Sequence, residues 1–126
     1  MGRDGLFVAD QGNHRIVKFN HEGQPTGSFT LPDEEEPAGL ALGPEGQLFV
    51  SLPRANQILV YDQDGNLLRD LTHSALRSPM HLHVHGRQLY IANQTGGLLL
   101  YDIAESTFRL IEGLRDEGDQ SKIKRV

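Results

Sequence analysis

The sequence contains no cysteine, which excludes disulfide bonds and cysteine-based catalysis. No apolar run approaches the ~18 residues of a membrane-spanning helix, so no membrane insertion is expected. No stretch keeps a helical period, and the nearest candidate, residues 103–112, has the Thr107 and alternating apolar side chains typical of a strand. The chain also lacks a phosphate-binding loop, a nucleophile elbow and a metalloprotease helix, and no catalytic motif surrounds Ser51, Ser74, Ser78 or Ser106. These absences predict an all-β chain in which no motif indicates an enzyme class.

The chain has no excess of positive charge, because 17 Asp and Glu outnumber 12 Lys and Arg and give a formal net charge of −5. A sequence-independent grip on nucleic acid needs Lys and Arg side chains that displace counterions, so this balance disfavours a nucleic-acid partner. The strongest acidic feature is the run Asp33–Glu36, which is predicted to be a solvated connector between two repeats.

One pattern of residues occurs three times in the chain. Phe7, Phe49 and Tyr90 occupy the same place in the three copies, at intervals of 42 and 41 residues. Each copy contains two short segments rich in Val, Ile, Leu, Phe and Tyr, which are typical of β-strands. The segments are Leu6–Asp10 with Ile16–Asn20, Leu48–Ser51 with Ile58–Asp62, and Leu89–Asn93 with Leu98–Asp102. A period in the forties with strand-like content predicts the blades of a β-propeller.

The second copy can be divided completely into strands and turns. Apolar stretches at 37–42, 47–52, 57–62 and 67–71 are predicted strands. Gly43–Gly46 is a predicted turn, since Pro presets one backbone dihedral and Gly supplies the positive one. The Asp64-Gly65 pair is the favoured pair for a hairpin turn. Four antiparallel strands in about forty residues make one propeller blade.

The three copies are unequal at their ends. We count three strands in the first copy and four in each of the others, with approximate boundaries 3–31, 36–71 and 78–114. Propellers typically carry about four to eight blades, so these copies are expected to be half of a six-bladed ring. Either the chain is part of a longer one, or two copies associate as a homodimer. In the second case the polar tail, 115–126, could donate Lys122–Val126 as the inner strand of a neighbour's first blade, which would remove the exposed edges. The alternative is an ordinary disordered tail, since Lys124 and Arg125 are poor residues for an inner strand.

The first copy resembles the NHL repeat. Its string Val8–Phe19 contains Asp10, Asn13, Arg15 and Ile16 in the order typical of that family. The second copy departs from the pattern, since it has Leu52 and Gln57 where the aspartate and the arginine are expected, and the third copy has His81 and Gly97 in place of a glycine and the arginine. The resemblance covers roughly residues 3–114. It implies a propeller, usually six-bladed, that serves chiefly as a binding platform, and relatives of similar fold include metal-dependent lyases and lactonases.

The motif residues of the first copy have a structural interpretation of their own. Asp10 and Arg15 flank a tight loop, and a bidentate pair between the guanidinium and the carboxylate would fix its geometry. Asn13 suits a left-handed turn position, which asparagine tolerates better than most residues. These three residues are therefore predicted to stabilise the loop.

Histidines alternate along the first predicted strand of the third copy, at positions 81, 83 and 85. Alternate side chains of a strand share a face, so His81, His83 and His85 would point together toward the central channel. Clustered imidazoles can bind zinc, copper or nickel, which makes a divalent metal the one cofactor that the sequence suggests. The alternative is that the rings line the channel and pack between blades, and the second copy offers only glycine and alanine at equivalent positions.

The loops between second and third strands, and between consecutive blades, should emerge at one end of the blades. We expect a protein or peptide partner to bind there, and the candidate residues are His14, Arg54, Asn56, His73, Arg77 and Gln94. The sequence thus favours a non-enzymatic binding scaffold. The alternatives are a metal-dependent lyase or hydrolase, similar to amidating lyases or lactonases, that uses the channel histidines, and a fragment whose function resides in missing blades.

Overall fold

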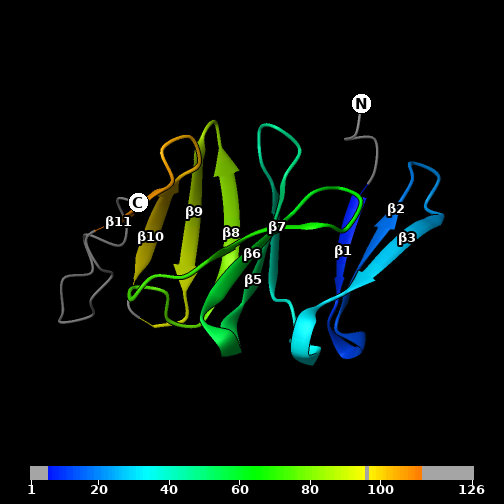
Figure 1. Cartoon of the computed structure of the whole chain (residues 1–126), viewed down its shortest axis with the longest axis horizontal. Helices are drawn as coiled ribbons and strands as arrows, with labels where there is room; N and C mark the ends of the chain where they lie inside the picture. Colours follow the sequence, from blue (N-terminus) through cyan, green and yellow to red (C-terminus); the bar gives the residue numbers. More distant parts are fainter. Residues whose placement is uncertain (1–5, 96, 112–126) are drawn as a thin grey trace.

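The computed structural model describes residues 6–95 and 97–111, which form three antiparallel sheets standing side by side in chain order (Figure 1). We call these sheets blades 1, 2 and 3. Blade 1 contains β1 (Leu6–Asp10), β2 (Arg15–Phe19) and β3 (Pro25–Thr30). Blade 2 contains β4 (Gly39–Leu42), β5 (Leu48–Leu52), β6 (Gln57–Tyr61) and β7 (Leu67–Leu71). Blade 3 contains β8 (Pro79–His85), β9 (Gln88–Asn93), β10 (Leu98–Asp102) and β11 (Thr107–Leu110), so the predicted all-β fold of three, four and four strands is confirmed.

Each blade is a meander in which every strand pairs with the next along the chain. The registers are equivalent, since Ile16 pairs with Phe29 in blade 1 and Ile58 pairs with Leu71 in blade 2. The segment at 103–112 that came closest to a helical pattern contains the strand β11, as its β-branched and alternating apolar residues predict. The described residues otherwise contain only short 3₁₀ turns, and none of their helices is long and apolar enough to cross a membrane.

Two hydrophobic clusters form the core, and both lie between blades because neighbouring sheets bury their facing side chains against each other. The first gap, between blades 1 and 2, contains the buried residues Ile16, Leu31, Leu48, Val50, Leu52, Leu59 and Tyr61. The second gap, between blades 2 and 3, contains the buried residues Phe49, Ile58, Val60, Leu71, Leu76, Leu89, Ile91, Leu99 and Tyr101. The fold therefore depends on stacking of blades, as in other repeat architectures.

The side chain of Ser51 on β5 connects the neighbouring inner strands β4 and β8. Its fully buried hydroxyl accepts a hydrogen bond from the Gly39 N–H at 2.8 Å and donates one to the Met80 carbonyl at 3.0 Å. A Cβ atom at Gly39 would overlap the same Met80 carbonyl, so only glycine fits there. We call this contact the Ser51 bridge, and it ties blade 2 to blade 3.

Blade 1 has no strand inside β1, which pairs only with β2 among the described residues. The apolar side chains of Leu6 and Val8 on this strand are 61% and 45% exposed. An unpaired strand edge can pair with another chain. The segment predicted to fill this place, Lys122–Val126, and the whole tail 115–126 lie outside the described residues.

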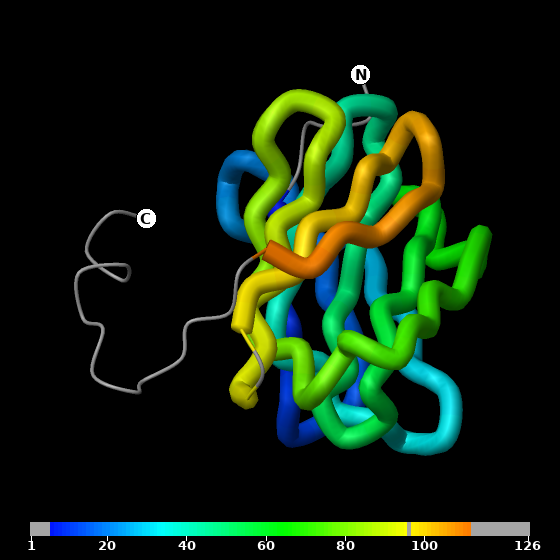
Figure 2. The backbone as a smooth tube through the Cα atoms, turned by 90° about the vertical axis from the view of Figure 1, so that its left-hand side faces the viewer, coloured from blue at the N-terminus to red at the C-terminus, as the bar shows by residue number. Residues whose placement is uncertain are grey.

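The two ends of the blades differ in the connections that they carry (Figures 1 and 2). At one end, which we call the turn end, tight hairpins connect β2 to β3, β4 to β5, β6 to β7, β8 to β9 and β10 to β11. Gly23, Gly46, Gly65 and Gly86 supply positive φ angles in four of these hairpins. The opposite, loop end carries the longer connections, including those from blade to blade. All six predicted partner-binding residues belong to connections at the loop end.

Candidate functional site

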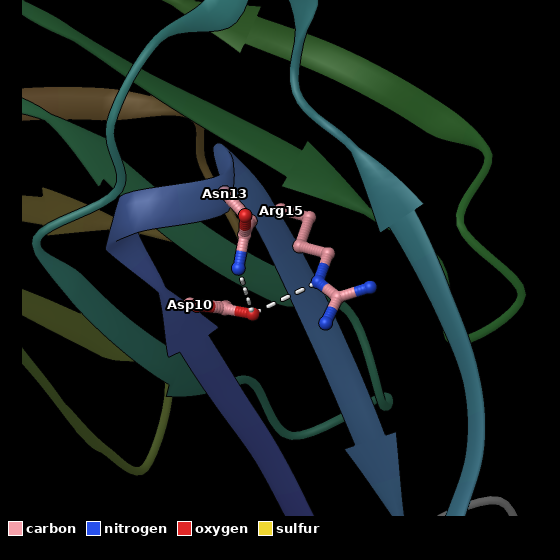
Figure 3. A network of polar contacts seen from close by, with 3 residues as sticks. All are labelled: Asp10, Asn13 and Arg15. Carbon is pink, nitrogen blue, oxygen red and sulfur yellow. Dashed lines mark hydrogen bonds and ion pairs between the residues drawn. The ribbon is translucent and has the colours of Figure 1, made fainter.

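The loop of blade 1 is held by a pair of side-chain contacts to one carboxylate oxygen (Figure 3). The Nε of Arg15 donates to Oδ2 of Asp10 at 2.9 Å, and the side-chain amide of Asn13 donates to the same oxygen at 3.1 Å. Arginine therefore contacts the carboxylate through a single nitrogen rather than as a bidentate fork. The hydrogen bond from Arg15, helped by that from Asn13, lowers the pKa of Asp10 below its usual range.

The prediction that Asn13 takes a left-handed turn position is wrong, because His14 takes that position with φ 54°. Residues 11–13 form a 3₁₀ turn that ends at His14, and the Asn13 side chain is used to bind Asp10. Blade 2 repeats the turn, with Asn56 at φ 54° after Pro53–Ala55. The left-handed residue is thus the last one before the strand in both blades.

Ser78 joins three loops at the loop end through its backbone. Its N–H donates to Oδ1 of Asn56 at 2.8 Å, and its carbonyl accepts from the Gln94 N–H at 2.9 Å. In the same region, Oδ1 of Asn93 accepts from the Arg77 N–H at 3.0 Å, and the Asn93 amide donates to the Ala75 carbonyl at 2.9 Å. We call these contacts the Ser78 network. They connect the β5–β6, β7–β8 and β9–β10 loops across two blades.

The structure brings most of the predicted partner-binding residues together around this network. Arg77 precedes Ser78 directly, Arg54 lies two residues before Asn56, and the side chains of both arginines and of Gln94 are exposed. His73 lies on the same β7–β8 loop, where its Nδ1 accepts from the Ala75 N–H at 3.0 Å and its ring lies 4.7 Å from that of Phe108. His14 is separate, because it belongs to blade 1 and its carbonyl accepts from the Leu31 N–H.

Exposed arginine side chains and strained backbone conformations both occur at the loop end. Among residues 6–95 and 97–111 the one ion pair is Asp10–Arg15, so the guanidinium groups of Arg54 and Arg77 have no carboxylate within 4.0 Å. Six of the described residues other than glycine have positive φ, which is costly for most side chains. Five of them are at the loop end, namely His14, Asp33, Glu34, Asn56 and Ser78. Such strain persists only where the surrounding contacts hold it, as the Ser78 network does for Asn56 and Ser78.

The three histidines of β8 lie on one exposed face of an edge strand. His81, His83 and His85 are exposed, while Leu82 and Val84 between them pack against the core of the second gap. His85 remains within the strand as its last residue. Within the described residues there is no group of three or more His, Asp or Glu side chains placed to hold a metal ion. The metal-binding role of these histidines therefore stays a prediction without a metal-binding geometry in support.

Two serines that stand in no catalytic motif turn out to organise the structure. Ser51 is fully buried in the bridge between blades, and Ser78 is the centre of the loop network. No local pattern could have found Ser78, because it acts through its backbone N–H and carbonyl, which every residue except proline has. The burial of Ser51 had a weak signal, since it lies within an apolar segment, Leu48–Leu52.

Comparison with known proteins supports the fold and not a particular family. No protein-family model matches the sequence, and no curated protein matches it. The solved structure of U3-55K matches 90% of this chain with a TM-score of 0.74 and 17% identity. The WD40 repeats of RRP9 match 87% with a TM-score of 0.70 and 18% identity, and virginiamycin B lyase from Staphylococcus aureus matches 90% with a TM-score of 0.74 and 15% identity.

This chain spans only 37%, 34% and 39% of the lengths of those three proteins. They include WD40 repeats and a lyase, and one fold can host many unrelated functions, so a likeness at such low identity shows the fold alone. The three described sheets are therefore β-propeller blades, and the chain is a partial β-propeller.

Proposed function

We propose that this chain is an NHL-type propeller unit that binds a protein or peptide partner at its loop end and is not an enzyme. The NHL assignment is supported by the Asp10, Asn13 and Arg15 contacts of blade 1, which give each residue of that motif a defined role in one loop. The six-bladed ring of that family is part of the same proposal. The observation that carries the binding role is the Ser78 network.

The network matters for binding because it fixes the loops before a partner arrives. A surface that is ordered in advance loses less conformational entropy on association, so more of the contact energy appears as affinity. Ser78 links loops from blades 2 and 3, and the exposed side chains of Arg54, Arg77 and Gln94 extend from those loops. Loop residues that were merely exposed to solvent would not require hydrogen bonds between the loops of two blades.

The chemistry of this surface favours a peptide segment with acidic side chains. The guanidinium groups of Arg54 and Arg77 have no carboxylate partner among the described residues, and guanidinium groups bind carboxylates with charge-assisted hydrogen bonds. Gln94 adds an amide that can pair with the peptide backbone. The acidic run at 33–36 lies at the same end but in the connection from blade 1, so it would limit the site to blades 2 and 3.

Selection of short random peptides displayed on phage would test this proposal. The bait is the full chain, and selected peptides are measured against a loop variant, Arg54→Ala with Arg77→Ala and Gln94→Ala. The matched control changes three exposed residues of the turn end, Asn66→Ala, Glu105→Ala and Gln24→Ala. We expect peptides rich in Asp and Glu that bind the wild type and the control alike and lose about tenfold or more in affinity for the loop variant.

Peptides that bind the loop variant as tightly as the wild type would place the binding surface elsewhere and overturn the proposal. Failure to recover any peptide dependent on these three residues, from a folded bait with an unchanged circular dichroism spectrum, would count against it equally. Because all three side chains are exposed, their removal should leave the fold intact.

We further propose that two copies associate to complete the ring, since the free edge of β1 exposes Leu6 and Val8 and lacks a partner strand among the described residues. Light scattering over a dilution series should then show a species of twice 14.0 kDa. Val8→Lys would place a charge on the open edge and should shift this species toward the monomer. A wild type that stays monomeric at all concentrations would contradict the homodimer and assign the ring closure to other blades of a longer chain.

A further inference from the structure

A cavity of about 380 Å³ opens between blades 2 and 3 at the turn end, opposite the loop end described above. Its walls come from the β4–β5, β8–β9 and β10–β11 turns and from the strands β5, β6, β7 and β10. Figures 1 and 2 both show the β4–β5, β8–β9 and β10–β11 turns gathered at this end. The volume lies at the lower end of the range of small-molecule sites, which runs from about 300 to 1,000 Å³.

The floor of the cavity is apolar and contains one polar atom without a partner. Phe49, Val60 and Tyr101 line it, and these side chains are 1%, 4% and 2% exposed. The Tyr101 hydroxyl is buried and makes no hydrogen bond within the described residues. A buried hydroxyl without a partner is costly, and such groups are rare in folded proteins. A ligand that reached Tyr101 could supply the missing hydrogen bond.

The rim of the cavity carries two guanidinium groups, those of Arg69 on β7 and Arg87 before β9. Arg69 reaches across the gap, where its Nη1 donates to Oγ of Ser106 at 3.1 Å. Neither arginine has a carboxylate within 4.0 Å in the described part of the chain, although Glu45 also lines the rim. The rim therefore has one net positive charge, and the Gln47 side chain orders its acidic side by accepting the Glu45 N–H at 2.9 Å.

We propose that this cavity binds a small organic acid with one carboxylate and a flat, largely apolar body that carries one hydrogen-bonding group for the Tyr101 hydroxyl. The body would pack on Phe49 and Tyr101, because aromatic rings favour offset or edge contacts with other flat groups. The carboxylate would lie at the rim, where a guanidinium offers two parallel N–H donors. A fully apolar ligand would leave the arginines unused, and a highly charged ligand would not fit the apolar floor.

Indole-3-acetate is a suitable probe, and the measurement is its fluorescence during titration with the full chain. The chain contains no tryptophan, so indole emission excited beyond the tyrosine absorption comes from the probe alone. We expect saturable binding of indole-3-acetate, with its neutral amide at least about tenfold weaker and with acetate unable to compete at equal concentration. Equal binding of the acid and the amide would remove the role of the arginines and overturn the proposal, as would the absence of saturable binding.

Three variants test whether the probe binds in the cavity. Arg69→Gln with Arg87→Gln removes the rim charge from exposed positions and should weaken binding by about tenfold or more, while Arg109→Gln, at an exposed position of β11 outside the cavity, should leave the affinity for the probe unchanged. Val60→Phe should fill the floor and abolish binding. If Val60→Phe does not fold, the arginine variant alone tests the proposal, because its two positions are exposed and their substitution should leave the fold intact. Unchanged affinity in the arginine variant would show binding at another place and contradict the proposal.

Discussion

The two gaps between blades are built from equivalent positions of the same repeat, yet they are filled differently. In the first gap the Phe29 ring lies 4.6 Å from the Tyr61 ring, and burial of Tyr61 raises the pKa of its hydroxyl. In the second gap the place of Phe29 is taken by the smaller Leu71, and Tyr101 packs on Phe108 of its own blade at 4.8 Å. Tyr101 also faces the Phe49 ring of blade 2, but at a longer ring separation of 6.5 Å, so the aromatic contact between blades is closer in the first gap.

The polar groups at the two gaps differ in the same way. The position of Val60 in the second gap is Lys18 in the first, where the ammonium group lies 5.6 Å from the centre of the Phe7 ring. The position of Arg69 is Gly27, so this position supplies no guanidinium across the first gap. The space there is smaller, at about 290 Å³, and Asp64 also lines it. Substitutions between copies of one repeat therefore produce, from a single backbone pattern, a smaller space lined by Lys18 and Phe29 and a larger space rimmed by two arginines.

The largest effect is expected at the Ser51 bridge, which has no counterpart between blades 1 and 2. Ser51→Ala leaves the Gly39 N–H and the Met80 carbonyl without their partner in a buried place, and should lower the free energy of unfolding by about 2–4 kcal/mol. The midpoint of urea unfolding, at constant m-value, measures this loss.

Ala9 occupies the position of Ser51 in blade 1 and supplies the matched control. Ala9→Ser adds a hydroxyl at a half-buried position against the core of the first gap and should lower the free energy of unfolding by about 1 kcal/mol or less. A loss below about 1 kcal/mol in Ser51→Ala would show that the bridge does not tie the blades together.

A smaller effect is expected at two equivalent glycines. Gly65 and Gly23 occupy the same hairpin turn in blades 2 and 1, with φ of +90° and +81°. An added Cβ at Gly65 would lie 3.0 Å from the Phe29 ring, whereas one at Gly23 would meet nothing within 4 Å. Gly65→Ala should thus cost about 1–2 kcal/mol and Gly23→Ala about 1 kcal/mol or less, since only the first disturbs the first gap.

Thermal unfolding of the two alanine variants, followed by circular dichroism, separates backbone cost from packing cost. If Gly23→Ala destabilises the chain as much as Gly65→Ala, then the positive φ accounts for both and the ring contact contributes nothing. A Phe29→Leu background should also remove the difference between the two variants, because the ring that Gly65 faces is then absent.

The repeat spacing predicted the strands well because two-residue alternation and turn glycines are local signals. The limits of the strands differ by one or two residues, as at Pro37, where the first strand of blade 2 was expected to begin and where the structure begins it at Gly39. The contacts between loops could not be predicted, since Asn56 and Ser78 meet through a backbone N–H that any residue except proline would offer. The cavity is equally hidden, because it depends on how Val60 and Tyr101 from different repeats leave space between them.

The smallest effect is expected at a position where blade 1 has a charged residue and blade 2 has an apolar one. Asp10 of blade 1 and Leu52 of blade 2 are equivalent, but Leu52 is buried in the first gap while Asp10 lies in a half-exposed ion pair. The pKa of Asp10 is lowered, chiefly by the hydrogen bond from Arg15, so the folded state binds this proton less tightly than the unfolded state does. Its contribution is present above the ordinary aspartate pKa of 3.8 and is lost as the pH falls through the lowered pKa.

Asp10→Asn should therefore flatten the fall of the unfolding midpoint below about pH 4 without changing the plateau slope at neutral pH. Asp62 provides the comparison, because hydrogen bonds from Asn66 lower its pKa as well, and Asp62→Asn should flatten a further part of the same acid limb. The Arg15→Gln variant should reproduce the effect of Asp10→Asn, since the two act through one contact. An acid limb that keeps its wild-type steepness in both Asp10→Asn and Arg15→Gln would show that the motif of blade 1 holds its loop without contributing to stability. The second blade, which lacks the pair and has a buried leucine instead, would then be the better model for how this repeat is stabilised.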